Sequence, residues 1–207
     1  WIEGDRFHNP TSENLSQLLL FVAELNELKE SKAAVQFPYA AEACLSGQEI
    51  YRQIQIRRDR LDQLKIKSDH LSSFLESIFD PLLGSVVDWA TDHWPQNQSF
   101  DEALPVKHQT LSPSDLGFHN ALWESSGTLR IIDLEYFGWD DPVKMASDFW
   151  WHPGMTLDHK LRRRWITEVT EIFHQDGAFD ARLRAAHPLY GLRWAMIVLR
   201  PFLLNEA

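Results

Sequence analysis

Leucine and valine recur at three- and four-residue steps in the first part of the chain, which is the spacing of one face of an α-helix. Pro10 is followed by Thr11 and Ser12, and either of these supplies a helix start. The apolar positions of this first helix are Leu15, Leu18, Leu19, Val22, Leu25 and Leu28. The pattern therefore predicts a long amphipathic helix from residue 11 onward.

Two further stretches have the same helical spacing. The second follows Ser46 and Gly47, and its apolar side consists of Ile50, Ile54, Leu61 and Leu64. The third begins near Asp69, and Pro81 must kink or split it. Its apolar side consists of Leu71, Phe74, Leu75, Ile78, Leu82 and Val86. We therefore expect residues 11–94 to form a helical region.

The helical spacing disappears between Pro95 and Pro142, where Pro, Ser, Gly and Asp surround short apolar runs. Residues 121–124 and 128–133 flank a short turn that contains Gly127, which is typical of a β-hairpin. Helical spacing returns over 157–175 and 183–204. The sequence thus predicts a mainly helical α+β fold with small β-hairpins, and no repeat or linker divides residues 1–207 into more than one domain.

Composition narrows the possible partners. A hydrophobic share of 44% with nine Trp and twelve Phe is typical of a folded chain. The net charge of −10 disfavours binding to nucleic acid through the overall field. Basic residues cluster at 57–60 and 162–164, either as solvated helix faces or as local contacts to phosphate or a membrane surface. With one cysteine, Cys44, and no signal peptide or membrane span, we expect a cytoplasmic protein without a membrane partner.

The candidate chemistry lies in the region of loops and strands. Asp115 is followed five residues later by Asn120, and Asp133 lies at the end of the predicted hairpin. This order is typical of a kinase catalytic loop and metal loop. A carboxylate is needed to orient the attacking hydroxyl, and an amide oxygen and a second carboxylate are needed to bind Mg²⁺. Asp115, Asn120 and Asp133 suit these roles in that order.

Two segments resemble motifs of the aminoglycoside phosphotransferase and choline kinase family. Residues 114–122, Ser-Asp-Leu-Gly-Phe-His-Asn-Ala-Leu, resemble its HGDxxxxNxL loop, and residues 132–136, Ile-Asp-Leu-Glu-Tyr, resemble its IDxE segment. Residues 138–142 are similar to the Gly-x-x-Asp-Pro stretch that follows, in which the Asp supports the loop. The resemblance implies the large lobe of a protein-kinase-like fold, with the hairpins carrying the catalytic and metal loops.

The same resemblance implies an activity and its cofactors. It assigns Asp115 as the catalytic residue and Asn120, Asp133 and Glu135 to the metal, with Mg²⁺ and ATP taking part. Glu135 either binds a second metal, contacts a water on the metal, or pairs with a nearby cation. The expected function is transfer of the γ-phosphate to a hydroxyl of a small molecule of aminoglycoside, choline, amino alcohol or sugar type. We expect that hydroxyl acceptor to be cationic or neutral.

The beginning of the chain fits the same order of segments. Trp1, Ile2 and Glu3, followed by Gly4, resemble the hinge between the two lobes of the family, whose backbone contacts adenine. The resemblance then divides the chain into a hinge (1–10), a helical region (11–94), the catalytic and metal loops (95–142) and C-terminal helices (143–207). The small nucleotide-binding lobe of the family would precede Trp1.

One departure from the family motif leaves an alternative open. Pro113 stands where the family has a His that braces the loop. A catalytically inactive, pseudokinase-like binding or scaffold protein is therefore the alternative to an enzyme. A purely helical interaction module would leave the carboxylates unexplained. The presence of Asp115, Asn120 and Asp133 together favours the enzyme.

Histidine and tryptophan residues near the motif have alternative interpretations. His119 beside Asn120 is interpreted as a structural or solvent-facing residue rather than a metal ligand or base. His152 and His159 do not have a zinc-site spacing. The tryptophans of the region either pack in the core or form an aromatic wall for a cationic substrate; these are Trp139, Trp150 and Trp151.

Overall fold

The computed structural model describes residues 4–7, 9–64, 68–155 and 157–204. The chain folds into two compact units, which are described separately. Unit 1 comprises the described residues up to Cys44 together with Leu104–Asp180. Unit 2 comprises Leu45–Ala103 and the described residues from Ala181 onward. The single domain over residues 1–207 stays a prediction.

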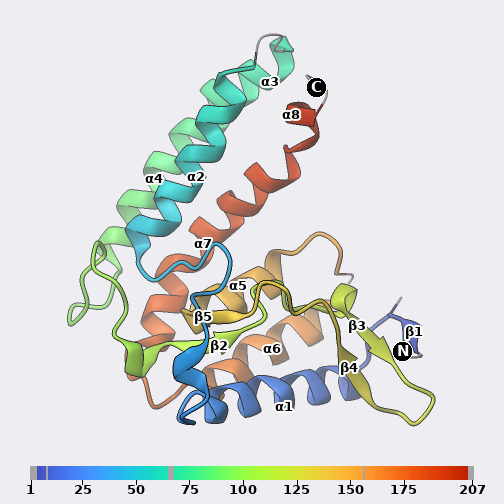
Figure 1. Ribbon diagram of the computed structural model, residues 1–207. Helices are drawn as coiled ribbons and strands as arrows, with labels where there is room; N and C mark the ends of the chain where they lie inside the picture. Colours follow the sequence, from blue (N-terminus) through green and yellow to red (C-terminus); the bar gives the residue numbers. More distant parts are fainter. Residues whose placement is uncertain (1–3, 8, 65–67, 156, 205–207) are drawn as a thin grey trace. The chain divides into compact units, whose positions relative to one another are not determined.

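Unit 1 contains three α-helices and two small antiparallel sheets (Figure 1). The helices are α1 (Ser12–Leu28), α5 (Pro142–Trp151) and α6 (His159–Ile172). One sheet has the order β1-β3-β4, with β1 at Asp5–Arg6, β3 at Ala121–Trp123 and β4 at Leu129–Ile131. The other pairs β2 (Thr110–Ser112) with β5 (Gly138–Asp140). Short 3₁₀ turns lie at η1 (Ala34–Gln36), η3 (Val106–His108) and η4 (Phe118–Asn120).

Helix α1 confirms the first predicted helix. Thr11 is its N-cap, and a capping box joins Thr11 to Asn14 through reciprocal side-chain to backbone hydrogen bonds. The α1 helix packs against α6, which runs beside it in Figure 1. The buried apolar side chains of α1 are those of the predicted stripe except Leu28, namely Leu15, Leu18, Leu19, Val22 and Leu25.

The two sheets place the ends of the segment that contains Asp115 and Asn120. Strand β2 ends at Ser112, opposite Gly138 of β5, and the loop 113–117 follows directly. The backbone of residues 38–40 lies against β5: Trp139 donates its N–H to Pro38 O at 2.9 Å, and a Cβ on Gly138 would meet that oxygen at 2.3 Å. Only glycine fits this close approach.

The predicted hairpin is confirmed as β3 and β4. Ala121 pairs with Ile131 and Trp123 with Leu129, while Gly127 takes a left-handed φ of 80° in the turn. Strand β1, which begins one residue after Gly4, pairs with β3 on the other side. The predicted hinge residues Trp1, Ile2 and Glu3 lie outside the described residues.

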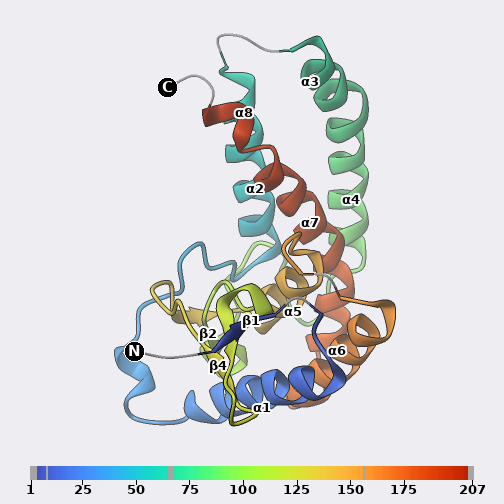
Figure 2. The same cartoon turned by 90° about the vertical axis from the view of Figure 1, so that its right-hand side faces the viewer.

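Unit 2 is helical (Figure 2). It contains α2 (Gly47–Asp62), α3 (Asp69–Phe74), the π-helical turn η2 (Leu75–Phe79), α4 (Asp80–Asp92) and α8 (Pro201–Leu204). Helix α7 (Phe179–Val198) contains Pro188 and belongs to unit 2 from Ala181 onward. Ser46 caps α2 through its side chain. Helix and small antiparallel sheets are thus what the described residues form, as the sequence predicts. No helix among them is both long and apolar enough to cross a membrane.

Candidate active site

The loop after β2 has a constrained backbone at Ser114. This residue adopts a left-handed φ of 67°, which a residue with a side chain rarely takes. Hydrogen bonds on both sides fix it: its N–H donates to Ser112 Oγ at 3.0 Å, its Oγ donates to Ala41 O at 2.8 Å, and Lys144 Nζ donates to its carbonyl oxygen at 3.3 Å. Because Asp115 follows directly, these contacts determine where its side chain begins.

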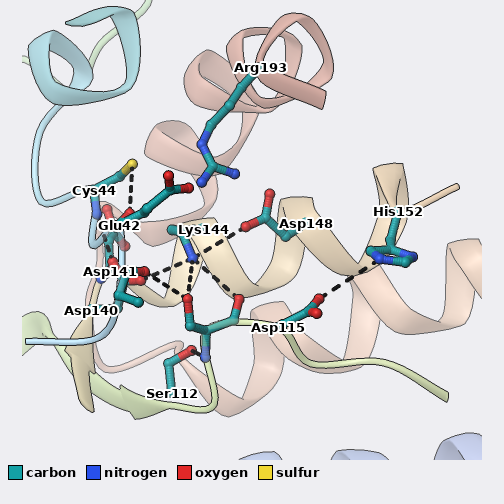
Figure 3. Close-up of polar contacts among 12 residues, drawn as sticks. Glu42, Cys44, Ser112, Asp115, Asp140, Asp141, Lys144, Asp148, His152 and Arg193 are labelled. Carbon is teal, nitrogen blue, oxygen red and sulfur yellow. Dashed lines mark hydrogen bonds and ion pairs between the residues drawn. The ribbon is translucent and has the colours of Figure 1, made fainter. Parts of the chain in front are cut away.

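Lys144 is a buried cation in the first turns of α5, with a side chain only 2% exposed. It pairs with Asp140 and Asp148, each at 3.3 Å and each four residues away (Figure 3). It also donates to Ser114 Oγ at 3.2 Å. Burial raises the pKa of Asp140 to about 6, although Lys144 and the backbone N–H groups of Cys44 and Asp141 act in the opposite direction. Lys144 thus ties α5 and β5 to the loop at Ser114, the residue directly after Pro113.

Asp115 lies at the centre of the candidate site. Its side chain is 44% exposed, its Oδ2 accepts from Asn120 Nδ2 at 3.1 Å, and its Oδ1 faces His119 Nε2 at 3.1 Å. His152 Nε2 lies 3.8 Å from the same Oδ1 (Figure 3). Burial raises the pKa of Asp115, but the interactions with His119, His152 and Asn120 outweigh it, so the pKa lies below its usual value. The carboxylate is therefore ionised at neutral pH.

The predicted metal ligands lie at the start and end of the hairpin. Asn120 O accepts the backbone N–H of Ile132 at 2.9 Å, which brings the backbone just before Asp133 beside Asn120. Asp133 is exposed and has a left-handed φ of 61°, and Glu135 is exposed in the following turn. Because Asn120 donates its Nδ2 to Asp115, its Oδ1 is left to accept or to bind a cation.

Asp141, Trp139 and Trp150, which lie near the loop in the sequence, make contacts within the protein. Asp141 accepts the backbone N–H of Val143 at 2.9 Å and caps α5, so it supports the fold. Trp139 packs against the cluster of Leu25, Ala34 and Leu111, which is the core interpretation. Trp150 lies under the guanidinium of Arg162, 5.4 Å from the ring centre, so an intramolecular cation already occupies one of its faces.

Three residues near Asp115 were not predicted as part of the site. Lys144 and Asp148 stand four residues apart in α5, a spacing that places the two side chains on one helix face and could have identified this pair. His152 has no such local signal, because 37 residues separate it from Asp115 and only the packing of α5 against the loop brings it near. The interpretation of His119 as merely structural or solvent-facing omits its contact with Asp115.

Comparison with known proteins adds little to this geometry. No protein-family model matches the chain, and no curated protein matches it. A solved structure that does match is the crystal structure of aminoglycoside phosphotransferase from Alicyclobacillus acidocaldarius. It is 12% identical, with 99% of this chain and 70% of that chain covered and a TM-score of 0.48. At that level of similarity the comparison assigns no activity to this chain.

Proposed function

We propose that this protein is a phosphotransferase that moves the γ-phosphate of ATP to a hydroxyl of a small molecule. The observation that carries the proposal is the pair of hydrogen bonds by which Asn120 connects Asp115 to the end of the hairpin. Asn120 donates its side-chain amide to the Asp115 carboxylate and accepts the backbone N–H of Ile132. A loop carboxylate, an amide five residues on and a hairpin carboxylate are the groups that phosphoryl transfer requires.

The side chains available for a metal ion are oxygen donors. Asn120 Oδ1, the exposed Asp133 carboxylate and the exposed Glu135 carboxylate are hard ligands, which suit Mg²⁺. No hydrogen bond or ion pair within the described part of the chain engages the Asp133 side chain. When bound, Mg²⁺ would neutralise the charge of the nucleotide phosphates. The donor set therefore fits the ion that the resemblance implies.

Asp115 would orient the hydroxyl of the substrate and accept its proton. Its ionised state and half-exposed position suit this role, since a group that contacts substrate must be reachable from solvent. The bracing of Ser114 by Lys144 supports the enzyme over the scaffold alternative, because the loop keeps a defined shape although Pro113 replaces the family's histidine.

Asparagine substitutions of Asp115 and Asp133 test the two proposed roles, because each substitution should impair a different step. Asp115→Asn keeps the shape of the side chain but removes the base, so turnover should fall by ~10²–10⁴-fold while Mg-ATP affinity barely changes. Asp133→Asn removes charge at the metal, so nucleotide binding should lose its dependence on Mg²⁺ together with the activity.

The measurements are turnover with a panel of alcohols and nucleotide titration with and without Mg²⁺. Asp88→Asn, an exposed carboxylate on α4, is the matched control and should behave as wild type. Wild-type turnover in Asp115→Asn would contradict the assignment of the loop. Binding of Mg-ATP without phosphorylation of any alcohol would favour the scaffold protein instead.

A further inference from the structure

Two imidazole rings lie face to face beside Asp115. The rings of His119 and His152 are 3.8 Å apart between centres and only 4° from parallel, and their Nε2 atoms lie 3.1 and 3.8 Å from the same Oδ1 of Asp115. His119 comes from the turn η4, and His152 follows the last residue of α5. The pair therefore depends on how α5 packs against the catalytic loop.

A glycine lies behind each ring. A Cβ on Gly117 would meet Nδ1 and Cε1 of His119 at 2.5 Å, and a Cβ on Gly154 would meet Cε1 of His152 at 2.8 Å. Real Cβ atoms do not approach so closely, so any larger residue at either position must displace a ring. Glycine at positions 117 and 154 thus leaves room for the two rings.

Hydrogen bonding determines which nitrogen of each ring holds the proton. The N–H of Gly154 donates to Nδ1 of His152 at 3.0 Å, so the proton of that ring is on Nε2. Nδ1 of His119 is buried without a hydrogen-bond partner, and a proton there would be a buried, unmatched donor. With its proton on Nε2, His119 instead donates to Asp115 Oδ1. Burial lowers the pKa of His152, which also favours a neutral ring.

We infer that His119 and His152 are positioning residues: His119 directs its Nε2–H at Asp115 Oδ1, His152 supports the ring of His119, and Oδ2 is left to receive the substrate hydroxyl. His119 makes a hydrogen bond, whereas His152 at 3.8 Å adds an electrostatic contact and holds the first ring by stacking. Asn120 takes one lone pair of Oδ2, so the other is left for the hydroxyl. This places the hydroxyl on the same side of Asp115 as the proposed metal ligand Asn120. The catalytic meaning of this inference rests on the proposed function.

The same three side chains could instead be considered for a transition metal, because their donor atoms lie within 4.8 Å of one another. Two observations oppose this. Nε2 of His152 holds the ring proton and has no lone pair for an ion. An ion bonded to Nε2 of both parallel rings would also lie well outside both ring planes, where imidazole does not bind metals.

The first test reads the ring protons directly and does not depend on activity. Long-range ¹H–¹⁵N spectra of histidine-labelled protein report the tautomer of each ring, and His119→Gln and His152→Gln assign the two signals by their disappearance. We expect both rings to be neutral with the proton on Nε2, and equimolar Zn²⁺ to leave them unchanged. A proton on Nδ1 of either ring, or a shift of both Nε2 signals by Zn²⁺, would overturn the inference.

The second test asks whether a hydrogen-bond donor at the position of His119 Nε2 is enough to restore turnover. Glutamine can place an amide N–H where Nε2 of His119 lies, whereas leucine fills the space without a donor. His119→Leu should lose about 10²-fold in turnover, the usual cost of a misplaced catalytic group, and His119→Gln should recover most of it with an unchanged KM for nucleotide. His159→Gln, an exposed histidine at the start of α6, is the control.

Melting curves separate positioning from folding in this comparison. Equal losses of turnover in His119→Leu and His119→Gln, or wild-type turnover in both, would contradict the role of the donor. If the wild type phosphorylated no alcohol, the proposed function would fail while the spectra would still decide the arrangement of the rings.

Discussion

At the scale of single residues, the loop 113–117 depends on a group of buried charged side chains. Lys144 holds Ser114 and at the same time neutralises Asp140 and Asp148, all inside unit 1. A buried ion pair adds little net stability relative to apolar residues, but removing one partner leaves a charge without compensation. We therefore expect these three charged side chains to determine the conformation of the loop more than they stabilise the fold.

The first prediction separates these two effects of Lys144. Lys144→Met should destabilise the protein by about 3–5 kcal/mol, because the buried carboxylates of Asp140 and Asp148 lose their contacts with the Lys144 cation. Adding Asp140→Asn and Asp148→Asn should recover most of the stability by removing those two buried charges, yet turnover should stay low because Ser114 still lacks both hydrogen bonds from Lys144. Denaturant unfolding and turnover measure the two effects. Full activity in the triple variant would show that Lys144 does not set the loop.

The second prediction uses the glycine behind His119. Gly117 has an extended backbone, so alanine is not strained there, but its Cβ would meet the His119 ring at 2.5 Å and Met155 Sδ at 2.9 Å. Gly117→Ala should cost about 1–3 kcal/mol by overpacking and lower turnover by moving the ring. Gly84→Ala is the matched control: no atom lies within 4 Å of its Cβ in α4, so it should stabilise by about 0.5–1 kcal/mol. Normal turnover in Gly117→Ala would contradict the positioning role of His119.

At the scale of elements, capping residues and apolar spacing predict most of the helices and one hairpin. The residues predicted wrongly have a cause in the local helix geometry. Thr11 and Ser46 cap the helices that their sequences indicate. The third helical stretch was expected to have Ile78 and Leu82 on its apolar side, but they are 58% and 47% exposed. The turn η2 before Pro81 is π-helical, so it has more residues per turn than an α-helix and shifts which side chains face the core. The buried residues are Leu71, Leu75, Phe79 and Leu83.

The third prediction concerns a histidine in α7. Burial lowers the pKa of His187 from 6.5 to about 4, so the unfolded chain takes up a proton at a higher pH than the folded one. Its contribution to stability is present above pH 6.5 and is lost as the pH falls toward 4. Between about pH 7.5 and pH 5 this should cost up to about 2 kcal/mol.

The measurement is urea unfolding of wild type and His187→Gln at both pH values. Asp140, whose pKa is raised, acts in the opposite direction as the pH falls, so only the difference between the two proteins isolates His187. His159→Gln should retain the pH dependence of the wild type, because that side chain is exposed. An identical pH dependence in all three proteins would contradict the lowered pKa.

At the scale of the whole molecule, the sequence predicted the fold class and the order of the candidate residues but not all of their neighbours. Asp115, Asn120 and Asp133 lie within one segment, so spacing and a hairpin suffice to associate them. Lys144 lies in α5 and His152 directly follows that helix, and only the tertiary packing of α5 brings these two residues to the loop. The apolar pattern of α5 predicts that the helix is buried, but it does not predict which loop the helix packs against.

The last prediction concerns the charge of the substrate. The net charge of −10, together with exposed Asp133 and Glu135 beside the loop, should attract a cationic alcohol and repel an anionic one. Because the Debye length shortens from about 10 Å at 0.1 M salt to about 3 Å at 1 M, kcat/KM for an amine-bearing alcohol should fall several-fold between low and high salt. The kcat/KM of a neutral alcohol of the same size should change little, and this alcohol serves as the control for effects of salt on nucleotide binding.

The experiment compares amine-bearing, neutral and phosphate-bearing alcohols at fixed Mg²⁺. If only the phosphate-bearing alcohols were phosphorylated, local basic residues rather than the overall field would govern the choice of substrate, and the expectation of a cationic or neutral substrate would be wrong.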